Sequence, residues 1–152
     1  EQKGFLEIVE VAKHFPEIKF ELVGNRRKTT YGINLGDNVV NIQNATKEDV
    51  VEKLDSADVF LFPSHAEGFS NALLEAMARG LPIICTNVGA NAEMVAGGYI
   101  VNVGDVSAMV EALEKMSSKE VRKVMSDANL LKVKENYLVE KVFDDLLKIY
   151  LE

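Results

Sequence analysis

Two carboxylates, Glu67 and Glu75, stand on either side of a predicted helix start, and their type and spacing suggest chemistry with a polar ligand. The free backbone N–H groups at the start of a helix attract anions, phosphates above all. Carboxylates accept hydrogen bonds from paired hydroxyl groups, such as those of a sugar or a ribose. A ligand with phosphate between two hydroxyl-rich parts would suit this arrangement.

A purely structural role for both carboxylates accounts for the same spacing and stays open at this point. Glu67 would then complement the dipole of the following helix. Glu75 would form an ion pair with Arg79, four residues further along the same helix. Neither of these roles requires a ligand.

The elements that must position these residues are a strand, a loop and a helix within residues 59–81. The apolar run of residues 59–62 ends at a proline, which predicts a buried strand with a firm stop. A polar loop follows over residues 64–69, and Ser70 is the predicted N-cap of the helix. The apolar stripe predicted for this helix consists of Leu74, Met77, Ala78 and Leu81.

Strands and helices alternate along the rest of the chain, and the strands are continuous apolar runs. This pattern predicts a Rossmann-like α/β fold, a three-layer sandwich with a mostly parallel sheet covered on both faces. Ligands bind at the carboxyl edge of such a sheet, where Glu67 is expected. The last helical region, residues 118–150, is expected to break near Asn136 and to carry a final apolar stripe of Val142, Phe143, Leu146, Leu147 and Tyr150.

Composition and charge indicate one domain and exclude several kinds of partner. With 152 residues, 47% hydrophobic and 27% charged, the chain can bury a core of its own. A net charge of −7 argues against nucleic-acid binding, which requires clustered Lys and Arg. Cys85 lies in an apolar run, so a buried, reduced thiol in a cytoplasmic protein is expected. No apolar run approaches the roughly 18 residues of a membrane span.

Residues 67–82, EGFSNALLEAMARGLP, resemble the Glu-x7-Glu motif of retaining glycosyltransferases with the GT-B fold, of the group 1 or family 4 type. Residues 62–64, residues 89–93 and the pair Lys3-Gly4 also resemble this family, so the similarity covers nearly the whole chain. The resemblance implies that residues 1–150 are the C-terminal, nucleotide-sugar-binding domain of such an enzyme. Residues 151–152 are expected to be an expression-vector scar.

The resemblance implies transfer of a sugar from a nucleoside diphosphate, such as UDP or GDP, to a glycan or lipid-linked acceptor in polysaccharide biosynthesis. An N-terminal domain outside this chain would recognise the acceptor, and the full-length protein would be cytoplasmic or peripheral to a membrane. No cofactor is expected apart from the donor substrate. No metal is expected either, because the sequence has no Asp/His cluster with ligand spacing.

The same resemblance assigns roles to individual residues. Glu67 is the implied catalytic residue and holds hydroxyls of the transferred sugar, Glu75 binds the ribose hydroxyls, and Lys3 neutralises the diphosphate. Fixed donors aimed at the departing diphosphate would lower the barrier. A solvated lysine and an exposed loop imidazole remain the alternatives for Lys3 and His65. The further donor-binding residues expected are His65, Gly68, Phe69, Ser70, Asn71 and Gly89.

The chain departs from the family pattern at several positions. A strand and an arginine that the family places before Lys3 would precede residue 1. Either the neighbouring strands close up or leave the sheet partly open, or residues before residue 1 supply the strand. Residues 43–45, Gln-Asn-Ala, replace a glycine and an apolar residue near the nucleotide base, and Ala90 replaces a second glycine. The cluster Arg26, Arg27 and Lys28 is either a solvated loop or a phosphate contact.

Two other functions are compatible with this fold, because the architecture hosts many chemistries. One is half of a sugar-nucleotide epimerase, although the Glu-x7-Glu spacing argues against it. The other is a non-catalytic nucleotide-binding module in which Glu67 and Glu75 are only structural. Replacement of Glu75 would separate these hypotheses, since only a ligand-binding role predicts a loss of nucleotide affinity.

Overall fold

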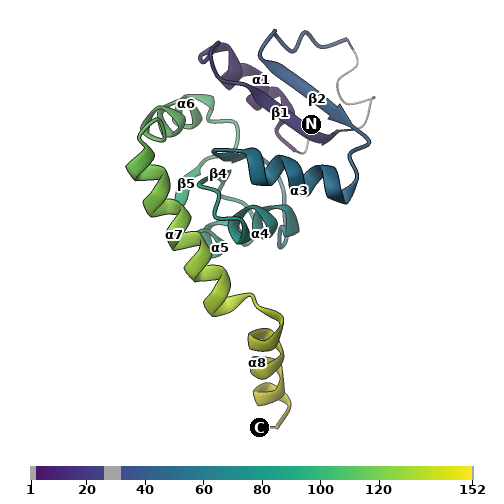
Figure 1. Cartoon of the computed structure of the whole chain (residues 1–152), viewed down its shortest axis with the longest axis vertical. Helices are drawn as coiled ribbons and strands as arrows, with labels where there is room; N and C mark the ends of the chain where they lie inside the picture. Colours follow the sequence, from purple (N-terminus) through teal and green to yellow (C-terminus); the bar gives the residue numbers. More distant parts are fainter. Residues whose placement is uncertain (1–2, 26–31, 152) are drawn as a thin grey trace.

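The computed structural model describes residues 3–25 and 32–151, and it arranges them in α/β layers with a helical tail (Figure 1). The predicted basic cluster Arg26, Arg27 and Lys28 lies outside the described residues. No described helix is long and apolar enough to cross a membrane. In chain order the elements are α1 (Phe5–Lys13), β1 (Phe20–Asn25), β2 (Val39–Gln43), α3 (Lys47–Ser56), β3 (Phe60–Phe62), α4 (Asn71–Ala78), β4 (Ile83–Thr86), α5 (Asn91–Met94), β5 (Gly98–Val101), α6 (Val106–Lys115), α7 (Lys119–Asn136) and α8 (Val139–Leu151).

The described strands pair in parallel, as predicted, but they form two sheets rather than one. The first sheet has the order β1-β2 and the second the order β3-β4-β5. Within the described residues, β1 and β3 therefore each keep one unpaired edge.

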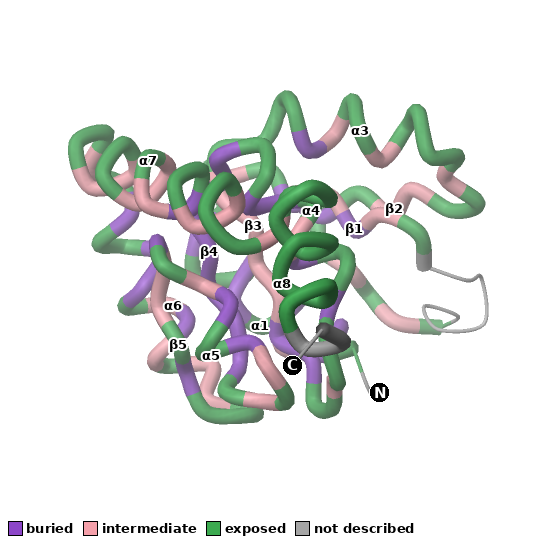
Figure 2. Tube along the Cα trace, turned by 90° about the horizontal axis from the view of Figure 1, so that it is seen from below, coloured by how far each residue is buried: buried purple, intermediate pink, exposed green. Residues whose placement is uncertain are grey.

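The central strand β4 explains why the fold has layers on both faces of the second sheet. Its four residues are buried, and successive side chains of a strand point to opposite faces. Ile84 joins an apolar cluster with residues of α1, α6, β1 and β2, whereas Ile83 and Cys85 join a second cluster with residues of α3, α4 and α5. Figure 2 shows the buried positions gathered along these inner faces. The prediction of a sheet covered on both faces is confirmed.

Polar side chains cap the backbone at the starts of α3 and α6. Thr46 Oγ1 accepts a hydrogen bond from the backbone N–H of Asp49 at 3.1 Å, and the Asp49 carboxylate accepts from the N–H of Thr46 at 2.8 Å. This reciprocal pair is a capping box, and it starts α3. At α6 the cap is Asp105, whose carboxylate accepts a hydrogen bond from the N–H of Ala108 at 3.0 Å.

The buried face of α4 is displaced from the predicted stripe. The structure buries Leu73, Ala76 and Met77, and the half-buried Leu74 packs against the same cluster, whereas Ala78 is exposed, so the predicted stripe is wrong at Ala78. This helix is apolar on more than one side, and several stripes therefore fit a 3.6-residue period. Packing decides among them, because Leu73, Ala76 and Met77 form one cluster with buried residues of α3, β4 and α5, against which Val133 of α7 packs.

The C-terminal helix α8 extends away from the layers (Figure 1). The predicted break after Asn136 is confirmed, since α7 ends there and α8 begins at Val139. The stripe predicted for this helix is not covered by any described element: Val142, Phe143, Leu146 and Leu147 are all exposed. The side chain of Tyr150, its last predicted member, lies outside the described ones. Periodicity identifies an amphipathic helix but not the surface that covers it.

A single buried side chain, Asn129, joins α7 to the second sheet. Its Oδ1 accepts hydrogen bonds from the backbone N–H groups of Ala96 and Gly97 at 3.2 and 2.7 Å. Its Nδ2 donates to the carbonyl oxygens of Leu81 and Gly97, both at 2.8 Å. Asn129 has no exposed surface, so it provides these four backbone groups with a partner away from solvent, and the Gly97 carbonyl also accepts from the N–H of Ile83 at 3.1 Å.

Replacement of Asn129 by alanine should lower the free energy of unfolding by about 2 to 4 kcal/mol, because buried backbone groups lose their partner. Urea denaturation measures this loss. Asn136→Ala is the matched control, since Asn136 lies on the same helix, is exposed and makes one hydrogen bond to the Lys132 carbonyl. Equal losses in the two variants would contradict the role of Asn129.

Candidate functional site

The motif loop, residues 63–70, connects β3 to α4 and carries most of the predicted site residues. Ser70 is buried and caps α4, since its Oγ accepts a hydrogen bond from the N–H of Leu73 at 3.3 Å. The prediction of this N-cap is confirmed. Asn71 follows as the first helical residue and is exposed, as is Gly68. The loop therefore ends at a capped helix start on the surface, where a dipole can favour an anion.

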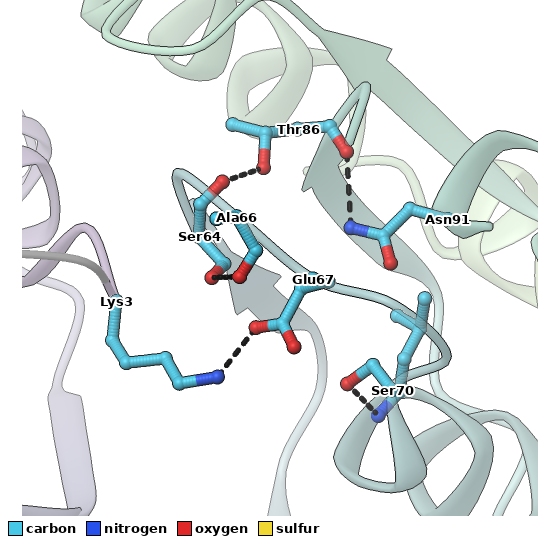
Figure 3. A network of polar contacts seen from close by, with 8 residues as sticks. Lys3, Ser64, Ala66, Glu67, Ser70, Thr86 and Asn91 are labelled. Atoms are coloured by element: carbon cyan, nitrogen blue, oxygen red, sulfur yellow. Dashed lines mark hydrogen bonds and ion pairs between the residues drawn. The ribbon is translucent and has the colours of Figure 1, made fainter. Parts of the chain in front are cut away.

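The Glu67 carboxylate is paired with Lys3, as Figure 3 shows. Lys3 Nζ lies 2.5 Å from Glu67 Oε1, and the Glu67 side chain is 11% exposed whereas that of Lys3 is 65% exposed. The ammonium group also lies 5.8 Å from the centroid of the Phe62 ring. The structure thus brings together two residues that are 64 positions apart in the sequence and that were predicted to share one site.

Gly4 allows Lys3 to reach the motif loop. Its φ is +65°, in the left-handed region that favours glycine. A Cβ at this position would lie 1.9 Å from the carbonyl oxygen of Pro63, which leaves no room for a side chain. The Lys3-Gly4 pair therefore has a structural explanation: the glycine sets the backbone against the loop, and the lysine extends over it.

His65 contacts α1 within the described structure. Its Nε2 lies 2.5 Å from Oε1 of Glu7, on the first turn of α1. His65 is 37% exposed at its side chain and Glu7 only 14%. The sequence analysis did not single out Glu7, because a glutamate on an amphipathic helix ordinarily faces solvent and nothing in its spacing connects it with residue 65.

The turn after β4 packs on the motif loop backbone to backbone. The N–H of Ala90 donates to the carbonyl of Gly68 at 2.9 Å. Gly89 has a φ of +52°, and a Cβ there would lie 2.3 Å from the carbonyl oxygen of Glu67 and 2.5 Å from that of Gly68. Gly89 is thus placed beside the residues with which it was predicted to act.

Beneath the loop lies a buried polar network that the sequence analysis missed (Figure 3). The Thr86 hydroxyl donates to the carbonyl of Ser64, and Asn91 Nδ2 donates to the carbonyl of Thr86 at 3.1 Å. All three residues are fully buried. The sequence did contain a signal for this network. Thr86 ends a continuous apolar run and Asn91 follows it closely, and polar side chains buried at such a place require hydrogen-bond partners.

Glu75 is exposed on α4, on the same side as the exposed Asn71. Arg79 pairs with Asp55 of α3, so the ion pair between Glu75 and Arg79 that the structural alternative required does not form. Within the described residues, Glu75 makes no side-chain hydrogen bond or ion pair. A carboxylate in this state is available to a ligand.

Phe69 is exposed, and its ring contacts that of Tyr137 edge to face, with centroids 5.9 Å apart. Burial, and then the nearby charge of Glu93, raise the pKa of Tyr137. Burial also raises the pKa of the Cys85 thiol to about 12, so this thiol stays protonated at neutral pH. Cys85 is a free, buried cysteine, as predicted.

A surface hollow of about 590 Å³ runs along α3 and contains none of the predicted site residues. It is lined by residues of that helix alone and brings no groups together from different elements. The motif loop, the start of α1 and the turn after β4 instead converge from three parts of the chain. The site is therefore assigned to this convergence.

Replacement of Gly89 by alanine should displace the motif loop and lower the free energy of unfolding by about 2 to 4 kcal/mol, because strain at positive φ adds to overpacking against two carbonyl oxygens. The matched control is Gly104→Ala, at a φ of +76° with no atom within 4 Å of the added Cβ. That variant should lose only about 1 kcal/mol. Chemical denaturation of both variants gives the difference, and equal losses would mean that the contact with the loop is unimportant.

The family model for glycosyl transferases of group 1 matches residues 2–119. The capsular polysaccharide biosynthesis glycosyltransferase CapM of Staphylococcus aureus is 34% identical over 117 residues, which are 74% of this chain and 30% of that protein. The chain spans less than half the length of the first curated relatives that it matches.

Two solved structures share the fold at low sequence identity. Sucrose-phosphate synthase from Thermosynechococcus elongatus has a TM-score of 0.85 at 21% identity, over 98% of this chain and 42% of that one. The C-terminal domain of a group 1 glycosyl transferase from Francisella tularensis has a TM-score of 0.75 at 22% identity, over 91% of this chain and 81% of that one. At these identities the likeness concerns the fold alone.

Proposed function

We propose, from the premise that the chain belongs to the group 1 glycosyl transferases, that it is the donor-binding part of a retaining enzyme that takes a sugar from a nucleoside diphosphate. The observation that carries this proposal is the contact of Lys3 with Glu67 beside the capped start of α4. A cation, a shielded carboxylate and a helix N-terminus in one place suit a ligand that carries both hydroxyls and phosphates.

Each of these groups has a distinct part in the proposed reaction. Glu67, little exposed, accepts hydrogen bonds from hydroxyls of the transferred sugar and so orients it. As the sugar departs, negative charge grows on the diphosphate, and Lys3 together with the N–H groups at the start of α4 stabilises that charge. Lys3 must then exchange its contact with Glu67 for one with the diphosphate. Its exposed side chain leaves it free to move.

Glu75 is assigned to the ribose hydroxyls of the donor. It lies on the exposed side of α4, one turn beyond Asn71, and it has no partner within the described residues. A carboxylate accepts two hydroxyl hydrogen bonds at once, as a ribose can donate. Glu67 and Glu75 would thus bind the two ends of the donor, with the diphosphate between them.

Acceptor recognition is proposed to belong to a domain outside this chain. The chain spans less than half the length of its first curated relatives, and a second domain would supply the groups that contact a glycan or lipid-linked acceptor. The chain alone is therefore expected to bind the donor without transferring the sugar efficiently.

Replacement of Glu75 by alanine should weaken donor binding by about 1 to 3 kcal/mol, roughly 5- to 150-fold, because a carboxylate that accepts ligand hydroxyls is removed. Calorimetric titration with UDP, GDP and ADP, each also as a sugar conjugate, measures the effect and identifies the base. Thermal stability should not change, since Glu75 is exposed and without a partner in the described structure.

The control is Glu111→Ala on α6, which removes the same charge from another exposed position. It should leave the affinity unchanged. Unchanged affinity in the Glu75 variant, with reduced stability, would favour the non-catalytic module with structural carboxylates. Absence of binding by the unmodified chain to all of these nucleotides would count against a donor site within this chain.

A further inference from the structure

Two polar contacts of opposite direction join the beginning of α1 to the motif loop. Lys3 forms an ion pair with Glu67, and the carboxylate of Glu7, four residues later, accepts a hydrogen bond from His65 Nε2. The two loop residues are separated by Ala66 alone. The N-terminal segment and the loop therefore touch at two side-chain contacts, and Gly4 packs against Pro63 beside them.

The two contacts differ in how readily a ligand could replace one of the partners. The Lys3 side chain is 65% exposed, and in the proposed function both it and Glu67 acquire donor groups as new partners. Glu7 is only 14% exposed, and no donor role is assigned to it. Because a carboxylate can only accept, His65 Nε2 must carry the proton in their 2.5 Å contact.

The rest of the loop is held at other points. Thr86 binds the carbonyl of Ser64, and Ala90 binds that of Gly68. Among the described residues, the segment of residues 65–67 between these points makes two side-chain hydrogen bonds to other parts of the chain, one from His65 and one to Glu67. Once Lys3 leaves Glu67 for a diphosphate, the contact of His65 with Glu7 is the one that remains.

We propose that Glu7 is a positioning residue: acting through His65, it keeps Glu67 in place while Lys3 exchanges partners. The proposal deepens the donor-binding function and rests on it for the role of Lys3. It assigns His65 a use that does not depend on direct contact with the donor. It also adds a residue outside the Glu-x7-Glu motif to the machinery that orients the transferred sugar.

The first test measures amide hydrogen exchange in the ligand-free chain of 152 residues. Glu7→Ala should raise the exchange rates of the amides of residues 65–69 by about three- to tenfold. This range lies between the effect of losing an exposed ion pair and that of losing a half-buried, charge-assisted hydrogen bond. Glu7→Gln keeps an acceptor for Nε2 and should restore most of the protection. Amides of β4 should exchange as in the unmodified chain.

The matched control is Glu10→Ala, which removes the same charge from the same helix, where Glu10 pairs with Lys13 at 2.5 Å on the surface. Its loop amides should exchange at the unmodified rate. Equal loop exchange in the Glu7 and Glu10 variants would overturn the proposal. So would a uniform rise over the whole chain after Glu7→Ala, since that would indicate only a loss of stability.

The second measurement compares the affinity for a nucleoside diphosphate with that for its sugar conjugate. A displaced Glu67 affects the sugar contact, so Glu7→Ala should weaken binding of the conjugate about three- to tenfold and change binding of the bare diphosphate by less than twofold. Equal losses for both ligands would overturn the positioning role. If the unmodified chain binds neither ligand, the proposed function fails, and the exchange measurement still decides whether Glu7 orders the loop.

Discussion

The close approach of two glycines to the backbone of the motif loop is the constraint on which the rest of the site depends. Gly4 lies against the carbonyl of Pro63, and Gly89 lies against those of Glu67 and Gly68. Both have positive φ, so a side chain at either position would be strained as well as obstructed. These contacts bring the start of α1 and the turn after β4 to the loop, and they do so without using any side chain that a ligand would need.

The polar side chains around the motif loop then fall into two groups, buried and exposed. The buried ones, Thr86 and Asn91, join the strand β4 to the loop and to α5, and they cannot reach solvent. The exposed ones, Lys3 and Glu75, are held weakly or not at all within the described structure. A loop fixed by backbone contacts and buried polar groups is preorganised, whereas its exposed charges can change partners at small cost.

Residues 60–81 show how much the sequence could predict. The strand, the proline stop and the Ser70 cap follow from local chemistry and are found, but the strand is half-buried rather than buried as predicted. The buried face of α4 could not be read in the same way, because the helix has apolar residues on several sides and packing against the neighbouring elements selects one. The role of Asn129 could not be predicted either, because an asparagine in a long amphipathic helix ordinarily faces solvent. Its backbone partners come from residues 81, 96 and 97, which only the fold brings beside it. Glu7 and His65 are 58 positions apart, and no periodicity connects them.

Two of the departures from the family pattern have different structural explanations. Asn44 lies in the turn of residues 43–45, which replaces a glycine and an apolar residue of the family, and its φ is +54°, a left-handed conformation that asparagine tolerates better than most residues. The turn can therefore keep its backbone shape while gaining an amide side chain close to where the base is expected. Ala90 also replaces a glycine, but its φ is −85°, so no glycine is required there. Because only the first replacement adds a hydrogen-bonding group, selection of the base should depend on Asn44 more than on Ala90.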